Sequence, residues 1–364
     1  MENTEASWFE KNPKKTVIVI LLLSLFILLF IAEKIFENKI GIKNNSHMRY
    51  VYVKEMLPNT NTIEESFRLD DTFVKLQSDE NGLVLPSKVY EKPDFSIFFM
   101  GSSTTLCANL EPEKRFSYFT GKLLEKKLEK KINSYNGAAG STTTFNGINL
   151  LVNKIIPYNP KYLIFMYNSP DLGRLLKSEK SYWENNYKTV DFSLFLLLRG
   201  IKNSLFPNLY YVIKTKIDLG TMIGNTLSYF TPSKNVVSSL EHPDFNKLET
   251  IYRKNLEAII SLCKIYNIVP VIMTEPYSEL AIQDNALGGK HRDVNKFMFY
   301  QNKFNEVIRD VASRSNAILI DLDKEITGSV ELFQGKFHLS EKGSIRVSNI
   351  IAMELYKAEK GNLK

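Results

Sequence analysis

Short apolar runs alternate with amphipathic stretches along most of the chain. Five of these runs have the length and composition of strands: Phe95–Met100, Ile132–Tyr135, Tyr162–Tyr167, Ile268–Met273 and Ala317–Ile320. Between and after them, apolar residues recur at helical spacing, which predicts helices over Arg115–Lys131, Phe145–Ile156, Leu248–Tyr266, Asn295–Ser315 and Ser340–Lys357. Strands that alternate with helices favour a parallel sheet covered on both faces. We therefore expect a three-layer α/β/α sandwich with a flavodoxin-like sheet.

A long apolar segment precedes this alternation. Residues 16–32 read TVIVILLLSLFILLFIA and contain no charge. A helix of this length spans roughly 26 Å at about 1.5 Å per residue, which is close to the thickness of a bilayer core. Glu33 and Lys34 follow directly, without the small-x-small pattern of a signal-peptide cleavage site. We predict one uncleaved transmembrane anchor, with a short tail (1–15) before it and a linker (33–62) after it.

The orientation of the anchor is less clear from the charges around it. Three lysines precede the anchor (Lys11, Lys14 and Lys15) and three follow it (Lys34, Lys39 and Lys43). The positive-inside rule therefore barely discriminates between the two orientations. The first three crowd the membrane edge together with the free amine, which favours a cytoplasmic N-terminus. The body would then lie outside the cytoplasm, at the cell membrane.

The rest of the chain, 63–364, is long enough for one large α/β domain. Residues 172–247 interrupt the alternation and are too many for a plain connection. We predict a helical insertion there that covers the site or contacts the membrane surface. In the second case it would offer a surface to a membrane-protein partner. Extra core helices are the alternative.

Composition and charge exclude several classes of protein. The chain is 44% hydrophobic and 24% charged, which is typical of a globular protein. Its net charge of +7 comes from lysines mixed with glutamates, and the densest run, Lys122–Lys131, has leucines at helical spacing. We interpret that run as the solvent-exposed face of an amphipathic helix rather than a nucleic-acid-binding patch. The two cysteines, Cys107 and Cys263, form no C-x-x-C pair, so we expect neither a thiol redox motif nor a metal site. A disulfide between them is the alternative in an oxidising compartment, but we favour two small buried thiols. We expect no cofactor.

Clusters of small and polar residues follow three of the predicted strands. They read Gly101-Ser-Ser-Thr-Thr105, Asn136-Gly-Ala-Ala-Gly140 and Asn168-Ser-Pro-Asp-Leu172. In parallel sheets ligands bind beyond the carboxyl ends of the strands. The three clusters therefore indicate a site at one edge of the sheet.

Two residues have the chemistry of nucleophilic catalysis. A serine hydroxyl needs a base within reach and donors aimed at the oxyanion that forms on attack. Ser103 stands in a turn of small residues just after a strand, with Ser102 as the neighbouring candidate. His338 precedes the last helix, where Ser340 can act as the N-cap. The other histidines, His47, His242 and His291, lie in polar, loop-like stretches.

The order of these motifs along the chain is GSST, NGAAGSTT, YNSPD and HLSEKG. It resembles the SGNH/GDSL hydrolase family over roughly Phe95 to Tyr356. The resemblance implies that Ser103 is the nucleophile and His338 the base. It also implies that the Gly140 N–H lies in the oxyanion hole.

The chain departs from the family pattern in the third block. That block usually reads G-x-N-D and supplies an asparagine side chain to the oxyanion hole. Here Pro170 or Asp171 takes the asparagine position, depending on the alignment. Asn168 lies close by, and we assign the role to it as a hypothesis.

The last block departs as well, because it usually reads D-x-x-H and Gly335 stands three residues before His338. The candidate acids for the third position are Asp321, Asp323 and Glu331, which precede His338 in the sequence. A backbone carbonyl that accepts from the histidine would instead give a dyad with a weaker base, slow turnover and a near-neutral pH dependence. We also expect Gly335→Asp to raise activity, provided that Gly335 does not need a positive φ.

The resemblance implies a serine-dependent esterase or acyl transferase that acts on O-acylated, often acetylated, carbohydrate. An anchor that places the body outside the cytoplasm makes a cell-envelope polysaccharide or a lipid-linked glycan the expected substrate. The alternative is a catalytically degenerate SGNH-like protein that binds glycan or a membrane partner.

Overall fold

The computed structural model describes residues 8–24, 27, 54–65, 73–177, 244–278 and 294–361. The chain divides into two units, 1–50 and 51–364, which are considered separately. The first contains α1 (Trp8–Lys11) and a helical stretch over 13–24, whose apolar side chains such as Leu21 and Leu22 are exposed.

Within the described residues, no helix combines the length and the apolar character needed to cross a membrane. The predicted anchor, 16–32, lies only partly among these residues, because 25–26 and 28–32 fall outside them.

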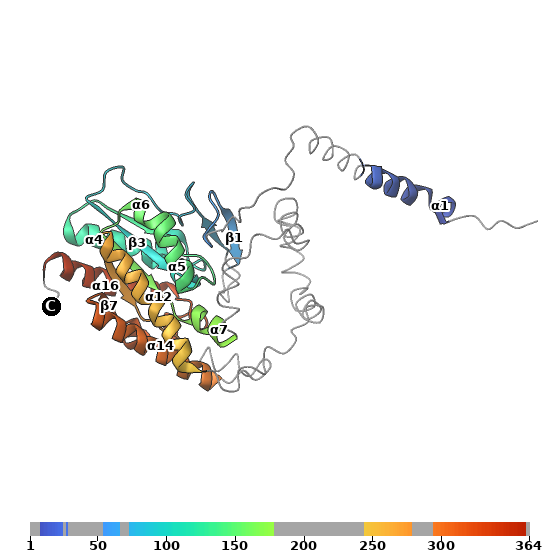
Figure 1. Cartoon of the computed structure of the whole chain (residues 1–364). Coiled ribbons are helices and arrows are strands. Elements are labelled where there is room, and N and C mark those ends of the chain that lie inside the picture. Colours follow the sequence, from blue (N-terminus) through green and yellow to red (C-terminus); the bar gives the residue numbers. More distant parts are fainter. Residues whose placement is uncertain are drawn as a thin grey trace, which may run out of the picture. The chain divides into compact units, whose positions relative to one another are not determined.

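The second unit is built on a sheet flanked by helices (Figure 1). The sheet has five parallel strands in the order β4-β3-β5-β6-β7. Its strands are β3 (Phe95–Gly101), β4 (Ile132–Asn136), β5 (Tyr162–Met166), β6 (Val269–Met273) and β7 (Ile318–Ile320). All five predicted strands are confirmed, with ends that differ by one residue. They were recognisable because strands buried on both faces carry continuous apolar runs. This is the flavodoxin-like order, in which the chain reverses direction across the sheet between β3 and β5.

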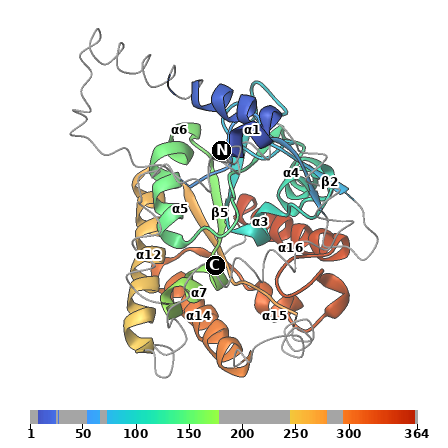
Figure 2. The same cartoon turned by 90° about the vertical axis from the view of Figure 1, so that its right-hand side faces the viewer.

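Helices cover both faces of the sheet, which confirms the three-layer sandwich (Figure 2). One face packs against α5 (Thr144–Leu150), α12 (Phe245–Ile265) and α14 (Val294–Ser315) through strand residues such as Phe98 and Phe165. The other packs against α4 (Phe116–Leu128) and α16 (Glu341–Glu359) through Phe99 and Ile164. Neighbouring strand residues thus point to opposite layers, as the pleat requires.

Short elements complete the unit. They are η1 (Pro112–Lys114), η2 (Leu151–Ile155), α6 (Ile156–Tyr158), α15 (Leu322–Ile326) and η4 (Val330–Leu332). An antiparallel pair, β1 (Asn61–Glu65) and β2 (Phe73–Gln77), was not predicted, and its first two residues fall in the predicted linker. Buried Arg115 ties β2 to the sandwich by donating to the Lys75 carbonyl at 2.8 Å and the Leu85 carbonyl at 2.9 Å.

The predicted insertion, 172–247, is described only at its ends. Its first residues belong to α7 (Ser169–Lys177) and its last to α12, while 178–243 lie outside the described residues.

The two cysteines are separated by the sheet. Cys107 packs in the core on the α4 side and Cys263 in the core on the α12 side, and both are free thiols. Burial raises the pKa of each thiol to about 12. The prediction of two buried thiols is confirmed.

Candidate active site

Ser103 lies at the carboxyl edge of the sheet, where β3 passes into the short helix α3 (Ser103–Leu106). Its side chain is half-buried, whereas Ser102 is 1% exposed, which makes Ser103 the more accessible of the two serines. The turn depends on Gly101, since a Cβ there would lie 2.2 Å from Thr105 Oγ1 and 2.7 Å from the Met166 carbonyl. Only glycine lets the chain turn this tightly against β5.

Two backbone N–H groups near this turn have no partner among the described residues. The Ser103 N–H opens α3, where a helix offers no internal acceptor, and Gly140 lies in an exposed turn. Neither N–H donates a hydrogen bond to any described residue. The Gly140 turn is held against the end of β3, because Ala139 N–H and Thr142 Oγ1 donate to the Gly101 carbonyl at 3.2 and 2.9 Å. Both N–H groups therefore border the end of the same strand.

His338 occupies the loop between η4 and α16 and is half-buried. Burial lowers the pKa of its imidazole below the usual 6.5. The ring is therefore neutral at pH 7, the state that a general base requires. Ser340 accepts from the Gly343 N–H at 3.1 Å, which confirms the predicted N-cap and fixes where the loop ends.

Hydrogen bonds from two sides attach the His338 loop to the carboxyl edge of the sheet at Ser103, which we call the serine edge. Asn109, shortly after α3, donates to the Leu339 carbonyl at 2.9 Å and to Gln334 Oε1 at 2.6 Å. From the segment after β6, the Ser278 N–H donates to the Lys336 carbonyl at 2.8 Å. The turn after β3 and the loop that carries His338 thus meet at one edge of the sheet.

Asn168 is placed differently from its predicted role. The residue is fully buried, and its Nδ2 donates to the Gln301 carbonyl at 3.1 Å and to Asn305 Oδ1 at 2.8 Å, both on α14. With its amide hydrogens engaged there, Asn168 has no donor left for an oxyanion. Neighbouring Asp171 is also buried and accepts from Thr144. Asn168 and Asp171 of the third motif therefore form buried hydrogen bonds at the start of α7. We no longer assign Asn168 to the oxyanion hole.

The three candidate acids that precede His338 in sequence have different surroundings. Arg309 donates to Asp321 through Nε at 2.9 Å and Nη2 at 2.8 Å, and Nη2 also donates to Asp323 at 2.6 Å. Burial alone would raise the pKa of Asp321, but the bonds from Arg309 hold it below its usual value. Glu331 is exposed. Gly335 has φ +104°, so the condition for an activating Gly335→Asp fails, and that prediction is withdrawn.

Sequence reasoning missed a fourth acid, Glu275, which follows β6 and is completely buried. One carboxylate oxygen accepts from Thr104 Oγ1 at 3.1 Å, and the other accepts from the Ser169 N–H at 2.6 Å. Burial raises its pKa, against these hydrogen bonds, which lower it. Glu275 couples the residue after Ser103 to the start of α7. Its only sequence signal was an acid just beyond a predicted strand.

Comparison with known proteins finds similarity at the level of structure alone. Neither a family model nor a curated protein sequence matches this chain. An acetylxylan esterase, Axe2 from Geobacillus stearothermophilus, aligns with a TM-score of 0.41 and 13% identity, over 72% of this chain and 94% of its own. TesA aligns with a TM-score of 0.42 and 11% identity, over 71% and 97% of the two chains.

The acetyl xylan esterase AlAXEase aligns with a TM-score of 0.40 and 15% identity, over 70% of this chain and 97% of its own. These neighbours are SGNH/GDSL hydrolases, the family that the motifs resemble. Likenesses this distant do not establish an activity, which has to be argued from the site.

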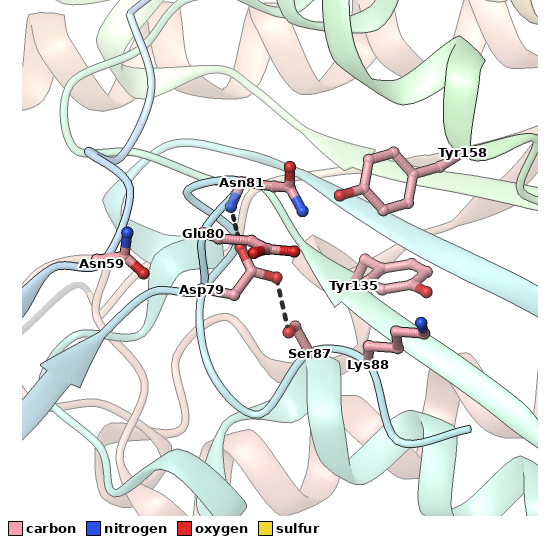
Figure 3. A pocket seen from close by; sticks show the side chains of 8 residues that line it. All are labelled: Asn59, Asp79, Glu80, Asn81, Ser87, Lys88, Tyr135 and Tyr158. Atoms are coloured by element: carbon pink, nitrogen blue, oxygen red, sulfur yellow. Dashed lines mark hydrogen bonds between the residues drawn. The ribbon is translucent and has the colours of Figure 1, made fainter. Parts of the chain in front are cut away.

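A hollow of about 330 Å³ lies elsewhere, beside β4 (Figure 3). It is lined by Asn59, Asp79, Glu80, Asn81, Ser87, Lys88, Tyr135 and Tyr158. Asp79 organises one wall by accepting from the Asn81 N–H at 2.9 Å and from Ser87 Oγ at 2.8 Å. Neither Ser103 nor His338 lines this hollow, so it is separate from the serine edge.

Proposed function

We propose that this chain is a serine-dependent esterase or acyl transferase of the SGNH/GDSL type, acting on an O-acylated carbohydrate. The observation that carries the proposal is the accessible Ser103 at the carboxyl end of β3, where the N–H groups of Ser103 and Gly140 have no partner among the described residues. His338, in the adjoining loop, is the base, and its lowered pKa keeps it neutral at pH 7.

The chemistry follows from these roles. Ser103 Oγ attacks the acyl carbonyl while His338 takes the hydroxyl proton, and the Ser103 and Gly140 N–H groups hold the oxyanion. The tetrahedral intermediate expels the sugar oxygen, which receives the proton from His338. Water, or a second sugar hydroxyl in a transferase, then attacks the acyl-enzyme with His338 again as base and releases Ser103.

The acetyl group and the envelope setting remain expectations. Acetylated carbohydrate is what the motif resemblance implies. The exposed apolar side chains over residues 17–23 support anchoring through 16–32. We further propose that the body lies outside the cytoplasm and that the substrate is an envelope glycan. A reporter that is active only outside the cytoplasm, fused at Lys364, tests this orientation: activity supports it, and silence from a well-expressed fusion contradicts it.

The activity is tested by acetate release from an acetylated oligosaccharide and from 4-nitrophenyl acetate, with the full chain in detergent. Ser103→Ala and His338→Ala should each lower kcat by about a thousandfold or more. Ser102→Ala is the matched control, because that buried hydroxyl makes no capping hydrogen bond. Full activity in Ser103→Ala would contradict the proposal. Adding a sugar acceptor and measuring how the acyl group divides between water and sugar separates hydrolase from transferase.

A second candidate function is glycan binding without turnover, and the hollow beside β4 favours it. Its lining combines two tyrosine rings with polar groups (Figure 3), the combination that small polar ligands use. The Tyr158 hydroxyl and the Glu80 carboxylate make no hydrogen bond to any described residue. Glycan binding that survives Ser103→Ala, in a wild-type chain without esterase activity, would establish this function instead. Hydrolysis by the wild type rejects it.

A further inference from the structure

A lysine from the predicted linker reaches the serine edge. Lys54 Nζ donates to the carbonyl of Ser141, 87 residues later in the chain, at 2.8 Å. Ser141 has a left-handed φ of +56° and directly follows Gly140, the proposed oxyanion donor. A Cβ built on Gly140 meets no atom within 4 Å, so there is open space on that side of the turn. Lys54 therefore holds its charge beside an open part of the site.

A second cation, Arg174, is close enough to Lys54 to lower the pKa of its amine. Arg174 stands on α7, whose first residue shares the Glu275 carboxylate with Thr104. Its half-buried side chain makes no hydrogen bond or ion pair with any described residue. Both cations thus belong to segments that border the turn of the reactive serine.

Neither cation forms an ion pair with a carboxylate of the described residues. Glu55, next to Lys54, is bound by Lys154, and Asp171, on the same helix as Arg174, is buried against Thr144. Burial, and then repulsion from Arg174, lower the pKa of Lys54 to about 8. Among the described residues, Arg174 is the charged group that shifts this pKa.

We propose that Lys54 and Arg174 form an anion subsite beside Ser103, so that the substrate is an acylated carbohydrate carrying a carboxylate or phosphate close to its ester. Two like charges partly removed from water cost free energy, and a bound anion offsets that cost. A guanidinium also matches the two oxygens of a carboxylate or phosphate. The subsite rests on the proposed function and gives it a substrate class.

The test compares kcat/KM for three acetylated substrates: neutral xylo-oligosaccharide, oligogalacturonate and a sugar phosphate. The wild type should prefer an anionic substrate over the neutral one, and the preferred anion identifies the group. Lys54→Met and Arg174→Gln should each lower the anionic-to-neutral ratio about tenfold. Exposed Lys92 has no role in the site, and Lys92→Met is the matched control that should leave the ratio unchanged.

The pH dependence supplies a readout that a loss of folding does not mimic. In the wild type the ratio should fall as pH rises through about 8, because Lys54 then loses its charge. Lys54→Arg should keep the ratio high above that pH, because a guanidinium stays protonated. Thermal unfolding of each variant confirms that it is folded.

Equal ratios in the wild type and both variants would overturn the subsite while leaving the esterase proposal intact. Hydrolysis of none of the substrates would instead overturn the esterase proposal. In that case calorimetric binding of deacetylated oligogalacturonate and of the sugar phosphate to Ser103→Ala decides the subsite. Binding weakened about tenfold by Lys54→Met supports it, and unchanged or undetectable binding of both ligands rejects it.

Discussion

Replacing Glu275 by leucine removes the acceptor that joins the serine turn to α7. The buried Thr104 hydroxyl and the Ser169 N–H would both lose their partner. Each donor left unsatisfied costs about 1–3 kcal/mol, so we expect Glu275→Leu to lower the free energy of unfolding by about 2–5 kcal/mol. Glu275→Gln keeps the shape and an acceptor for Ser169, while Thr104 turns its hydroxyl to accept from the new amide, and we expect a loss of about 1 kcal/mol or less.

The same pair of variants separates charge from shape through pH. Burial raises the pKa of Glu275 in the folded protein above its usual 4.5, so the folded state holds this proton more tightly than the unfolded chain. The resulting stabilisation is fully present below pH 4.5 and is lost as pH rises through the folded pKa. Glutamine cannot titrate, so the wild type should lose stability relative to Glu275→Gln as pH rises from 4.5 into that range.

Urea unfolding of the wild type, Glu275→Leu and Glu275→Gln between about pH 4.5 and 8 measures both effects, with exposed Glu331→Gln as the control for losing a carboxylate. A Glu275→Leu variant as stable as the wild type would refute the inferred coupling. A parallel pH dependence of the wild type and Glu275→Gln would show that the pKa of Glu275 is not raised.

Three further predictions concern the glycines and the histidine. Gly343→Ala should lower the free energy of unfolding by about 1–3 kcal/mol, because its Cβ would lie 2.0 Å from the Leu332 carbonyl oxygen. Urea unfolding measures this loss. The control is Gly173→Ala, at an open position on α7, which should raise the free energy of unfolding by up to about 1 kcal/mol. Gly335→Asp should cost about 1–3 kcal/mol and not raise kcat, because φ +104° strains any side chain; an esterase assay with more activity than the wild type would contradict this. The acidic limb of kcat/KM should lie below pH 6.5, since burial lowers the pKa of His338 and only the neutral ring acts as base; a limb at or above 6.5 would argue against His338 as that base.

The sandwich was predictable because its signals are local. The strands carry continuous apolar runs, since both faces of the sheet are buried, and Ser340 marks the start of the last helix through its own hydrogen bond. The pair of β1 and β2 was missed because Asn61–Glu65 contains one apolar residue and no alternation. Most of the insertion stays a prediction because it lies outside the described residues, and the anchor stays one because 25–26 and 28–32 do.

The site was predictable only in part, because its members are distant in sequence. Ser103 and Gly140 follow predicted strands, and the parallel sheet places such positions at one edge. The contact of Glu275 with Thr104 spans 171 residues, and that of Lys54 with Ser141 spans 87, so no local pattern announces either. Asn168 was misassigned because the sequence does not reveal which neighbour accepts the hydrogen bonds of a buried amide. Here the acceptors are on α14.

The most direct measurement of the central claim is covalent labelling by a fluorophosphonate, which reacts with a serine activated as a nucleophile. The full chain in detergent should be labelled once, and peptide mass spectrometry should place the adduct on Ser103. Labelling should be lost in Ser103→Ala, reduced strongly in His338→Ala and retained in Ser102→Ala. A folded wild-type chain that takes up no label, or one labelled at another residue, would contradict the assignment of Ser103 as the nucleophile.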